Sequence, residues 1–156
     1  MKQIQIITGK IRIGKTTYLE NLILSLKHVV GILQPTDEDH RFFKDIETGE
    51  FFRITELSEQ HNTFKLGRFI FNYDSFNWAR AKLTEAFEWN NDTIVIDEYG
   101  PLEFQGEGLE PIVTKIITSS NKTIKIIIVV RDQLLENFLE KFKLKEENVE
   151  IIRLEN

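Results

Sequence analysis

Residues 9–16 read Gly9-Lys10-Ile11-Arg12-Ile13-Gly14-Lys15-Thr16, and this stretch decides the fold. Its glycines, its lysine and its hydroxyl residue follow the spacing G-x-x-x-x-G-K-[ST] of a phosphate-binding loop. Such a loop requires a strand before it and a helix after it. Residues 4–8 are rich in β-branched side chains, and residues 17–28 carry apolar side chains at helical spacing, namely Leu19, Leu22, Ile23 and Leu26. The sequence therefore predicts strand, loop and helix in the order that binds nucleotide phosphates.

The residues of this loop divide into a backbone cradle and two side chains with separate tasks. The N–H groups of the loop and of the first helical turn point at phosphate oxygens, because a helix begins with unpaired donors and the positive end of its dipole. Lys15 is expected to bridge the β- and γ-phosphates as a catalytic cation, and the Thr16 hydroxyl is expected to bind Mg²⁺. We therefore expect nucleotide contacts from Gly9, Lys10, Ile11, Arg12, Ile13, Gly14, Lys15, Thr16 and Thr17. The alternative is an ordinary turn between a strand and a helix.

Two adjacent carboxylates follow a second apolar run. Residues 93–96 have the pattern of a buried strand, and Asp97 and Glu98 come directly after it. Asp97 is expected to hold Mg²⁺ through a bound water, and Glu98 is expected to deprotonate the water that attacks the γ-phosphate. Alone, this pattern is common at solvated strand ends. Together with the phosphate-binding loop it indicates nucleotide hydrolysis.

The rest of the chain alternates between short strands and helices. Strands are predicted for residues 29–33, 124–130 and 149–154, and helices for residues 75–89 (with Ser75 as the N-cap), 109–119 and 133–142. A hairpin formed by residues 42–46 and 51–54, and a strand within residues 67–72, are predicted between the two motifs. We therefore expect one α/β domain over residues 1–156: a three-layer αβα sandwich with a mostly parallel central sheet and a β-hairpin insertion.

Two arginines are candidates for contacts with phosphate. Arg131 directly follows the strand predicted for residues 124–130. Ligands bind beyond the carboxyl ends of parallel strands, so Arg131 is expected to stabilise charge in the transition state as a catalytic residue. A surface ion pair is the alternative. Arg41 follows the acidic residues 37–39 and is either a phosphate or base contact or the counterion of those acids.

Composition limits the classes of protein that the chain can represent. The 156 residues carry a net charge of −5 and include no cysteine. The acidic charge argues against a nucleic-acid partner, and the absence of cysteine excludes disulfides and thiolate metal sites. The longest apolar runs, such as residues 126–130, are far shorter than a membrane helix. We expect a cytoplasmic domain whose protein partners, if any, the sequence does not identify.

Both motifs resemble those of a known family. The loop with Thr17, followed later by residues 96–104, which read Ile-Asp-Glu-Tyr-Gly-Pro-Leu-Glu-Phe, is similar to the small THEP-type nucleoside-triphosphatase family. The resemblance implies a RecA-like P-loop fold, Mg²⁺-dependent hydrolysis and loose base selectivity, and Glu103 matches the second acid of the family pattern. The loop departs from the pattern at Ile11 and Arg12, where the family usually carries proline and glycine or another glycine.

Two other functions share these motifs. A small nucleotide or metabolite kinase would use the same loop and Mg²⁺ to transfer the phosphoryl group to an acceptor, although the arginine-rich lid usual in such kinases is missing from the sequence. A slow nucleotide-dependent switch or assembly module would signal through residues 37–54. Hydrolysis of nucleoside triphosphates, ATP and GTP among them, to the diphosphate and phosphate is the function that we expect.

Overall fold

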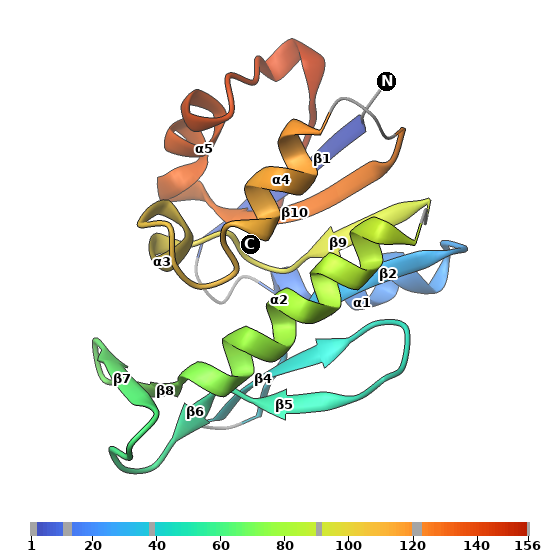
Figure 1. The fold of residues 1–156 in the computed structure, drawn as a ribbon. Helices are drawn as coiled ribbons and strands as arrows, with labels where there is room; N and C mark the ends of the chain where they lie inside the picture. The colour runs from blue at the N-terminus through green and yellow to red at the C-terminus, as the bar shows by residue number, and fades with distance from the viewer. Residues whose placement is uncertain (1–2, 11–13, 38–39, 90–91, 120–122, 156) are drawn as a thin grey trace.

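The computed structural model describes residues 3–10, 14–37, 40–89, 92–119 and 123–155. Its main sheet has eight strands in the order β11-β1-β10-β9-β2-β4-β3, with β5 paired to β4 (Figure 1). These strands are β1 (Gln3–Gly9), β2 (Val29–Leu33), β3 (Thr36–Asp37), β4 (His40–Asp45), β5 (Phe51–Arg53), β9 (Thr93–Ile96), β10 (Lys125–Arg131) and β11 (Glu150–Arg153). The five strands from β11 to β2 are parallel, whereas β4 joins β2 antiparallel. The predicted mostly parallel sheet is confirmed.

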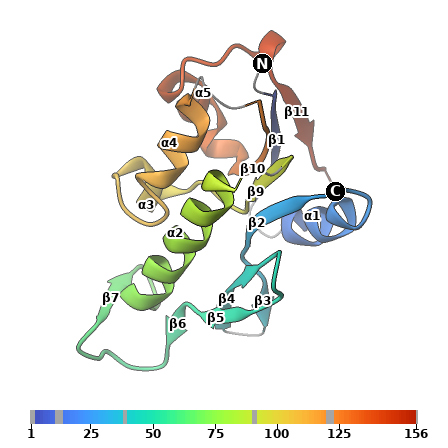
Figure 2. The ribbon, with the colours of Figure 1, turned by 45° about the vertical axis from the view of Figure 1, so that its right-hand side comes forward.

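Helices cover both faces of this sheet, as Figure 2 shows. Helix α1 (Lys15–Leu24) lies on one face, and α2 (Tyr73–Glu88), α4 (Ile112–Thr118) and α5 (Leu135–Lys141) lie on the other. Short helical segments add α3 (Pro101–Phe104) and two 3₁₀ turns, Asp132–Leu134 and Glu146–Asn148. Two hydrophobic clusters form, one on each face of the sheet, because successive side chains of a strand point to opposite faces. Ile7 packs with Leu19 of α1, while Ile6 packs in the cluster that contains Phe138 of α5.

Short strands occupy the segment between β2 and α2, residues 34–72, which we call the insertion. The predicted hairpin is confirmed, since β4 and β5 pair antiparallel with Phe43 opposite Phe52. A further three-stranded sheet in the order β6-β8-β7 was not predicted as a sheet, and only its strand β8 (Phe69–Asn72) was expected. Its other strands are β6 (Thr55–Glu56) and β7 (Thr63–Leu66). The rings of Phe64 and Phe71 pack on Phe76 of α2 and attach this sheet to the body of the protein.

Some predicted helix boundaries are wrong. Asn72, not Ser75, is the N-cap of α2, because the Asn72 side chain accepts a hydrogen bond of 2.7 Å from the Ser75 N–H. The helix predicted from residue 109 begins at Ile112, and the carboxylate of Glu110, which precedes it, accepts from the Thr114 N–H at 2.7 Å. Among the described residues, none of the helices has the length and apolar character needed to cross a membrane.

Gly31 fixes the distance between β2 and β9. It lies opposite Val95 in the parallel register, with a φ of 131° that side chains rarely adopt. A Cβ atom at this position would lie 2.1 Å from the backbone oxygen of Val95. Because the obstacle is backbone and not a flexible side chain, only glycine allows this strand pair to form next to the carboxylates that follow β9.

Gly31→Ala is expected to destabilise the fold by about 3 kcal/mol or more, through the clash and the positive φ together. Gly49→Ala is the matched control, since Gly49 has a φ of 78° but open space where its Cβ would lie. That control should cost about 1 kcal/mol. Urea unfolding of both variants measures the difference, and equal losses would contradict the close approach at Gly31.

Candidate active site

The candidate residues meet because their strands are parallel. Strands β1, β10, β9 and β2 end at the same edge of the sheet, so the segments that follow them converge there. The phosphate-binding loop follows β1, Asp97 and Glu98 follow β9, and Arg131 ends β10. Gln34, which follows β2, is a fourth contributor that the sequence analysis did not single out. The strand-end rule that located Arg131 would also have found Gln34.

Asp97 lies at the centre of this edge. Its Oδ2 atom accepts hydrogen bonds of 2.8 Å from the Thr16 hydroxyl and of 2.8 Å from the Gln34 backbone N–H. Only 2% of Asp97 is exposed, and burial raises the pKa of its carboxyl to about 6, although both hydrogen bonds oppose the rise. The carboxyl therefore remains mostly ionised at neutral pH.

The Lys15 side chain reaches back to the end of β1 and the residue after it. Its ammonium donates hydrogen bonds to the carbonyls of Gly9, at 3.1 Å, and Lys10, at 2.6 Å. Burial lowers its pKa, an effect that the charge of Glu98 partly reverses. Helix α1 begins right after Gly14, whose φ of 94° is a left-handed conformation that suits glycine. The ammonium is thus held beside the carbonyls of Gly9 and Lys10.

Four further loop residues were predicted to contact phosphate. Thr17 lies in the first turn of α1 beside Thr16, and it is exposed. The expected phosphate contacts of Ile11, Arg12 and Ile13 lie outside the described residues. The structure therefore brings together Lys15, Thr16 and the two carboxylates.

Glu98 is held by two arginines and by an unusual backbone. Its φ of 85° lies in the left-handed region, which is uncommon for a residue with a side chain. Arg131 donates to Oε1 from Nε at 2.9 Å and lies 2.8 Å from it through a terminal nitrogen. Arg41, from β4 of the insertion, lies 3.5 Å from Oε2. Arg131 therefore forms the ion pair that was the alternative to a phosphate contact, and its partner is the candidate base.

A buried polar network supports the segment after Glu98. The Tyr99 hydroxyl donates to a carboxylate oxygen of Glu110 at 2.6 Å, and burial raises the pKa of that hydroxyl. Glu103 accepts from the backbone N–H groups of Gly100, at 2.8 Å, and Leu109, at 2.9 Å. Burial raises the pKa of Glu103 to about 7. These bonds fix the loop that follows the two carboxylates.

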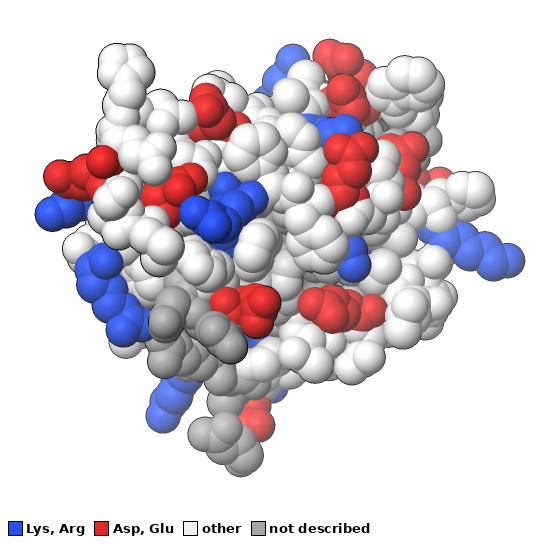
Figure 3. Space-filling view, turned by 90° about the horizontal axis from the view of Figure 1, so that it is seen from below, with Lys and Arg blue, Asp and Glu red and all other residues white. Residues whose placement is uncertain are grey.

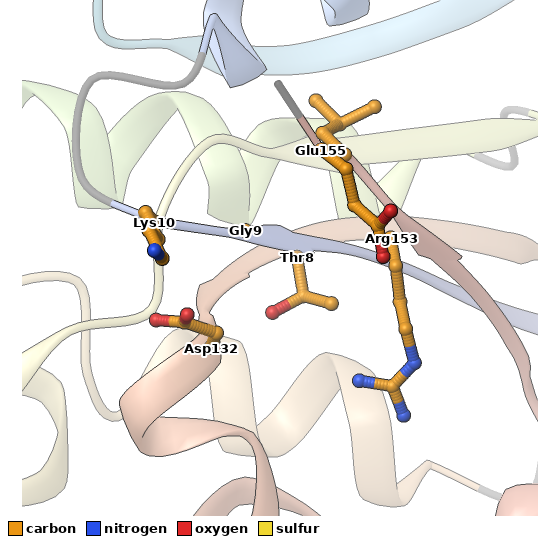
Figure 4. Close-up of a pocket in the computed structure, with 7 residues that line it drawn as sticks. Thr8, Gly9, Lys10, Asp132, Arg153 and Glu155 are labelled. Carbon is orange, nitrogen blue, oxygen red and sulfur yellow. The ribbon is translucent and has the colours of Figure 1, made fainter.

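A cavity of about 380 Å³ opens beside the start of the phosphate-binding loop. Figure 4 shows Lys10 and Asp132 on one side of it and Arg153 on the other. The side chain of Thr8, which belongs to β1, points into the space between them. The Thr8 hydroxyl is buried and has no hydrogen-bond partner in the described structure. Both signs of charge line this cavity, so it differs from a cationic phosphate cradle.

Charges are also mixed on the face seen in Figure 3, where basic and acidic side chains are interspersed.

The strand order, the loop after β1 and the carboxylates after β9 define a P-loop nucleotide-binding protein of the α/β class. The sequence profile of a family described as NTPase matches residues 5–156. The chain belongs to this family of P-loop NTPases and is a nucleoside-triphosphatase. The expected resemblance to THEP-type enzymes is confirmed.

Individual relatives agree with this assignment. The nucleoside-triphosphatase THEP1 of Sulfolobus acidocaldarius is 28% identical over 130 residues, which are 78% of this chain and 74% of that protein. The crystal structure of THEP1 from the hyperthermophile Aquifex aeolicus has a TM-score of 0.75 at 20% identity, over 99% of this chain and 90% of its own. The solution structure of a human cancer-related nucleoside triphosphatase has a TM-score of 0.65 at 18% identity, over 97% and 88%. At these identities the two structures show the shared fold.

The burial of Glu103 predicts a dependence of stability on pH. Its pKa rises from an ordinary 4.5 to about 7 on folding, so the folded protein binds the extra proton and stability falls as pH rises between these values. The rise corresponds to about 3 kcal/mol. In Glu103→Gln this loss should disappear, while the variant is less stable than wild type at pH 4.5 because one backbone N–H loses its acceptor.

Urea unfolding at pH 4.5 and 8, without nucleotide or metal, measures this effect. The stability advantage of wild type over Glu103→Gln should shrink by about 3 kcal/mol across this interval. Glu107→Gln is the control, because Glu107 is exposed. An advantage that is the same at both pH values would contradict the assigned burial.

Proposed function

We propose that the chain hydrolyses nucleoside triphosphates with Mg²⁺, giving the diphosphate and phosphate, and that Glu98 activates the attacking water. The observation that carries this proposal is the contact of 2.8 Å between the Thr16 hydroxyl and the Asp97 carboxylate. It joins the phosphate-binding loop to the strand that ends at Glu98. Loop, metal-binding oxygens and candidate base are therefore adjacent, although they are more than 80 residues apart in sequence.

The chemistry of the donors at this contact suits Mg²⁺. A threonine hydroxyl and a carboxylate are oxygen ligands of the kind that this hard cation accepts. Asp97 would hold the ion through a bound water, and Thr16 would supply its hydroxyl oxygen as a ligand. When bound, Mg²⁺ would neutralise charge on the β- and γ-phosphate oxygens.

Groups of the protein itself would bind the phosphates, accept the proton of the attacking water and stabilise the transferring group. The backbone N–H groups of the loop bind the phosphates, and Lys15 moves from the Gly9 and Lys10 carbonyls to the β- and γ-phosphate oxygens. Glu98 accepts a proton from water as the bond from the water oxygen to the γ-phosphorus forms. The bond from the γ-phosphorus to the bridging oxygen breaks, and the diphosphate leaves. Arg131 holds Glu98 in place and offers positive charge to the transferring group.

We also propose that residues 1–156 act as one domain. Two observations support it: the family profile covers residues 5–156, and one hydrophobic cluster includes side chains from the short strands between β2 and α2, from the parallel strands and from the four helices α2, α3, α4 and α5. A single core of this kind is typical of one folding unit.

A panel of nucleoside triphosphates with Mg²⁺ tests the function. Phosphate release should occur without any acceptor, should stop when Mg²⁺ is removed by a chelator, and should be absent in Lys15→Ala. Transfer that requires an added nucleotide or metabolite would identify a kinase instead. Hydrolysis by Lys15→Ala at the wild-type rate would remove the loop from the mechanism.

Glu98→Gln tests the proposed base. Glutamine keeps the size of the side chain but cannot accept the proton, so single-turnover hydrolysis should slow by about 10² to 10⁴-fold. Nucleotide affinity should stay within about threefold, because the phosphate contacts come from the loop and Lys15. Affinity and single-turnover rate are measured on one preparation, with Glu107→Gln as the control. An unchanged rate would show that Glu98 is not the base.

A further inference from the structure

The two arginines on Glu98 occupy different oxygens of its carboxylate. Arg131 makes both of its contacts, at 2.8 and 2.9 Å, with Oε1. Arg41 makes its contact, at 3.5 Å, with Oε2. All three side chains are about a fifth to a quarter exposed. Oε1 is thus held tightly, whereas Oε2 has the longer and weaker contact.

Arg41 is built into the insertion more firmly than a surface arginine would be. Its backbone N–H donates to the Thr55 hydroxyl at 3.1 Å, and its carbonyl accepts from the Ile54 N–H at 2.8 Å. Its guanidinium lies over the rings of Phe69 and Phe71, at 5.8 and 6.0 Å from their centroids. A guanidinium over aromatic rings is stabilised while its N–H groups stay free for an anion. The insertion therefore delivers a fixed cation to the site.

These groups share a small hollow between the insertion and the carboxyl ends of the parallel strands. It has a volume of about 50 Å³, and its charged lining consists of Arg41, Glu98, Glu103 and Arg131. Gln34 also lines it, and the Gln34 N–H is one of the two groups that donate a hydrogen bond to Asp97. The hollow thus adjoins the proposed metal-binding oxygens. Two guanidiniums face the single carboxylate of Glu98, since the buried Glu103 bonds to backbone N–H groups.

We propose that Arg41 binds the γ-phosphate, and that in the nucleotide-free protein it occupies Oε2 of Glu98, the oxygen that must accept the proton. This proposal rests on the proposed function. A γ-phosphate carries more negative charge than one carboxylate and competes for the guanidinium. Arg41 then leaves Oε2 free for the attacking water, while Arg131 keeps Oε1 in place. A nucleoside diphosphate has no γ-phosphate, so Arg41 stays on Glu98 when the product is bound.

The test is the preference of the protein for triphosphate over diphosphate. Affinities for a non-hydrolysable triphosphate analogue and for the diphosphate are measured by calorimetry with Mg²⁺. In Arg41→Ala the analogue should bind about 10-fold more weakly and the diphosphate within about twofold of wild type. The single-turnover rate should fall by about 10²-fold or more, and Arg41→Lys should recover part of both losses because it keeps the charge.

Arg68→Ala is the matched control. Arg68 belongs to the same insertion, is exposed and lies over the Phe69 ring at 4.8 Å. It should leave rate and affinities unchanged, and circular dichroism checks that each variant is folded. Should Arg41→Ala fail to fold, Arg41→Gln, which keeps much of the side-chain length, takes its place.

Three results would overturn the proposal: equal losses of triphosphate and diphosphate affinity, an unchanged single-turnover rate, or an effect of Arg68→Ala as large as that of Arg41→Ala. Failure of the proposed function looks different. In that case the wild-type protein releases no phosphate from any nucleoside triphosphate. A wild-type enzyme that hydrolyses them, and an Arg41→Ala variant that does so equally well, would reject the role of Arg41 alone.

Discussion

The buried carboxylate of Asp97 is the interaction on which the rest of the site depends. Three separate segments meet at this group: the phosphate-binding loop through Thr16, the end of β2 through the Gln34 N–H, and its own strand β9. Burying a carboxylate is costly unless hydrogen bonds compensate it, so the loop and the sheet edge are tied to one geometry. The close approach of β2 and β9 at Gly31 brings Gln34 into reach. The glycine in β2 therefore contributes to the position of the Asp97 carboxylate.

The insertion adds one charged side chain, Arg41, to the edge of the sheet where the candidate site lies. The parallel strands and the segments that follow them supply Lys15, the two carboxylates and Arg131, whereas Arg41 comes from β4, which joins the sheet antiparallel. Positive charge therefore reaches Glu98 from both sides. Under the role proposed above, Arg41 is a cation supplied by the same chain. Glu98, whose φ of 85° is left-handed, contacts both arginines.

Local patterns predicted the parts of the structure that local forces determine. The strand and helix on either side of the loop, and the strand before Asp97, follow from motif spacing and apolar periodicity. Both strands are found where expected, whereas the helix predicted for residues 17–28 spans Lys15–Leu24 and ends four residues early. The contact of Arg41 with Glu98 spans 57 residues and depends on how the insertion folds back, which no local pattern records. The Asn72 cap was missed for a related reason, because asparagine and serine are both good caps and three residues separate them.

A crystal structure with Mg²⁺ and a non-hydrolysable nucleoside triphosphate tests the account most directly. We expect the triphosphate oxygens to lie against the N–H groups of residues 9–16, with Mg²⁺ between Thr16 and Asp97. The Lys15 ammonium should leave the Gly9 and Lys10 carbonyls for the phosphates. A triphosphate bound elsewhere, for instance in the cavity lined by Arg153, with Lys15 still on those carbonyls, would contradict it.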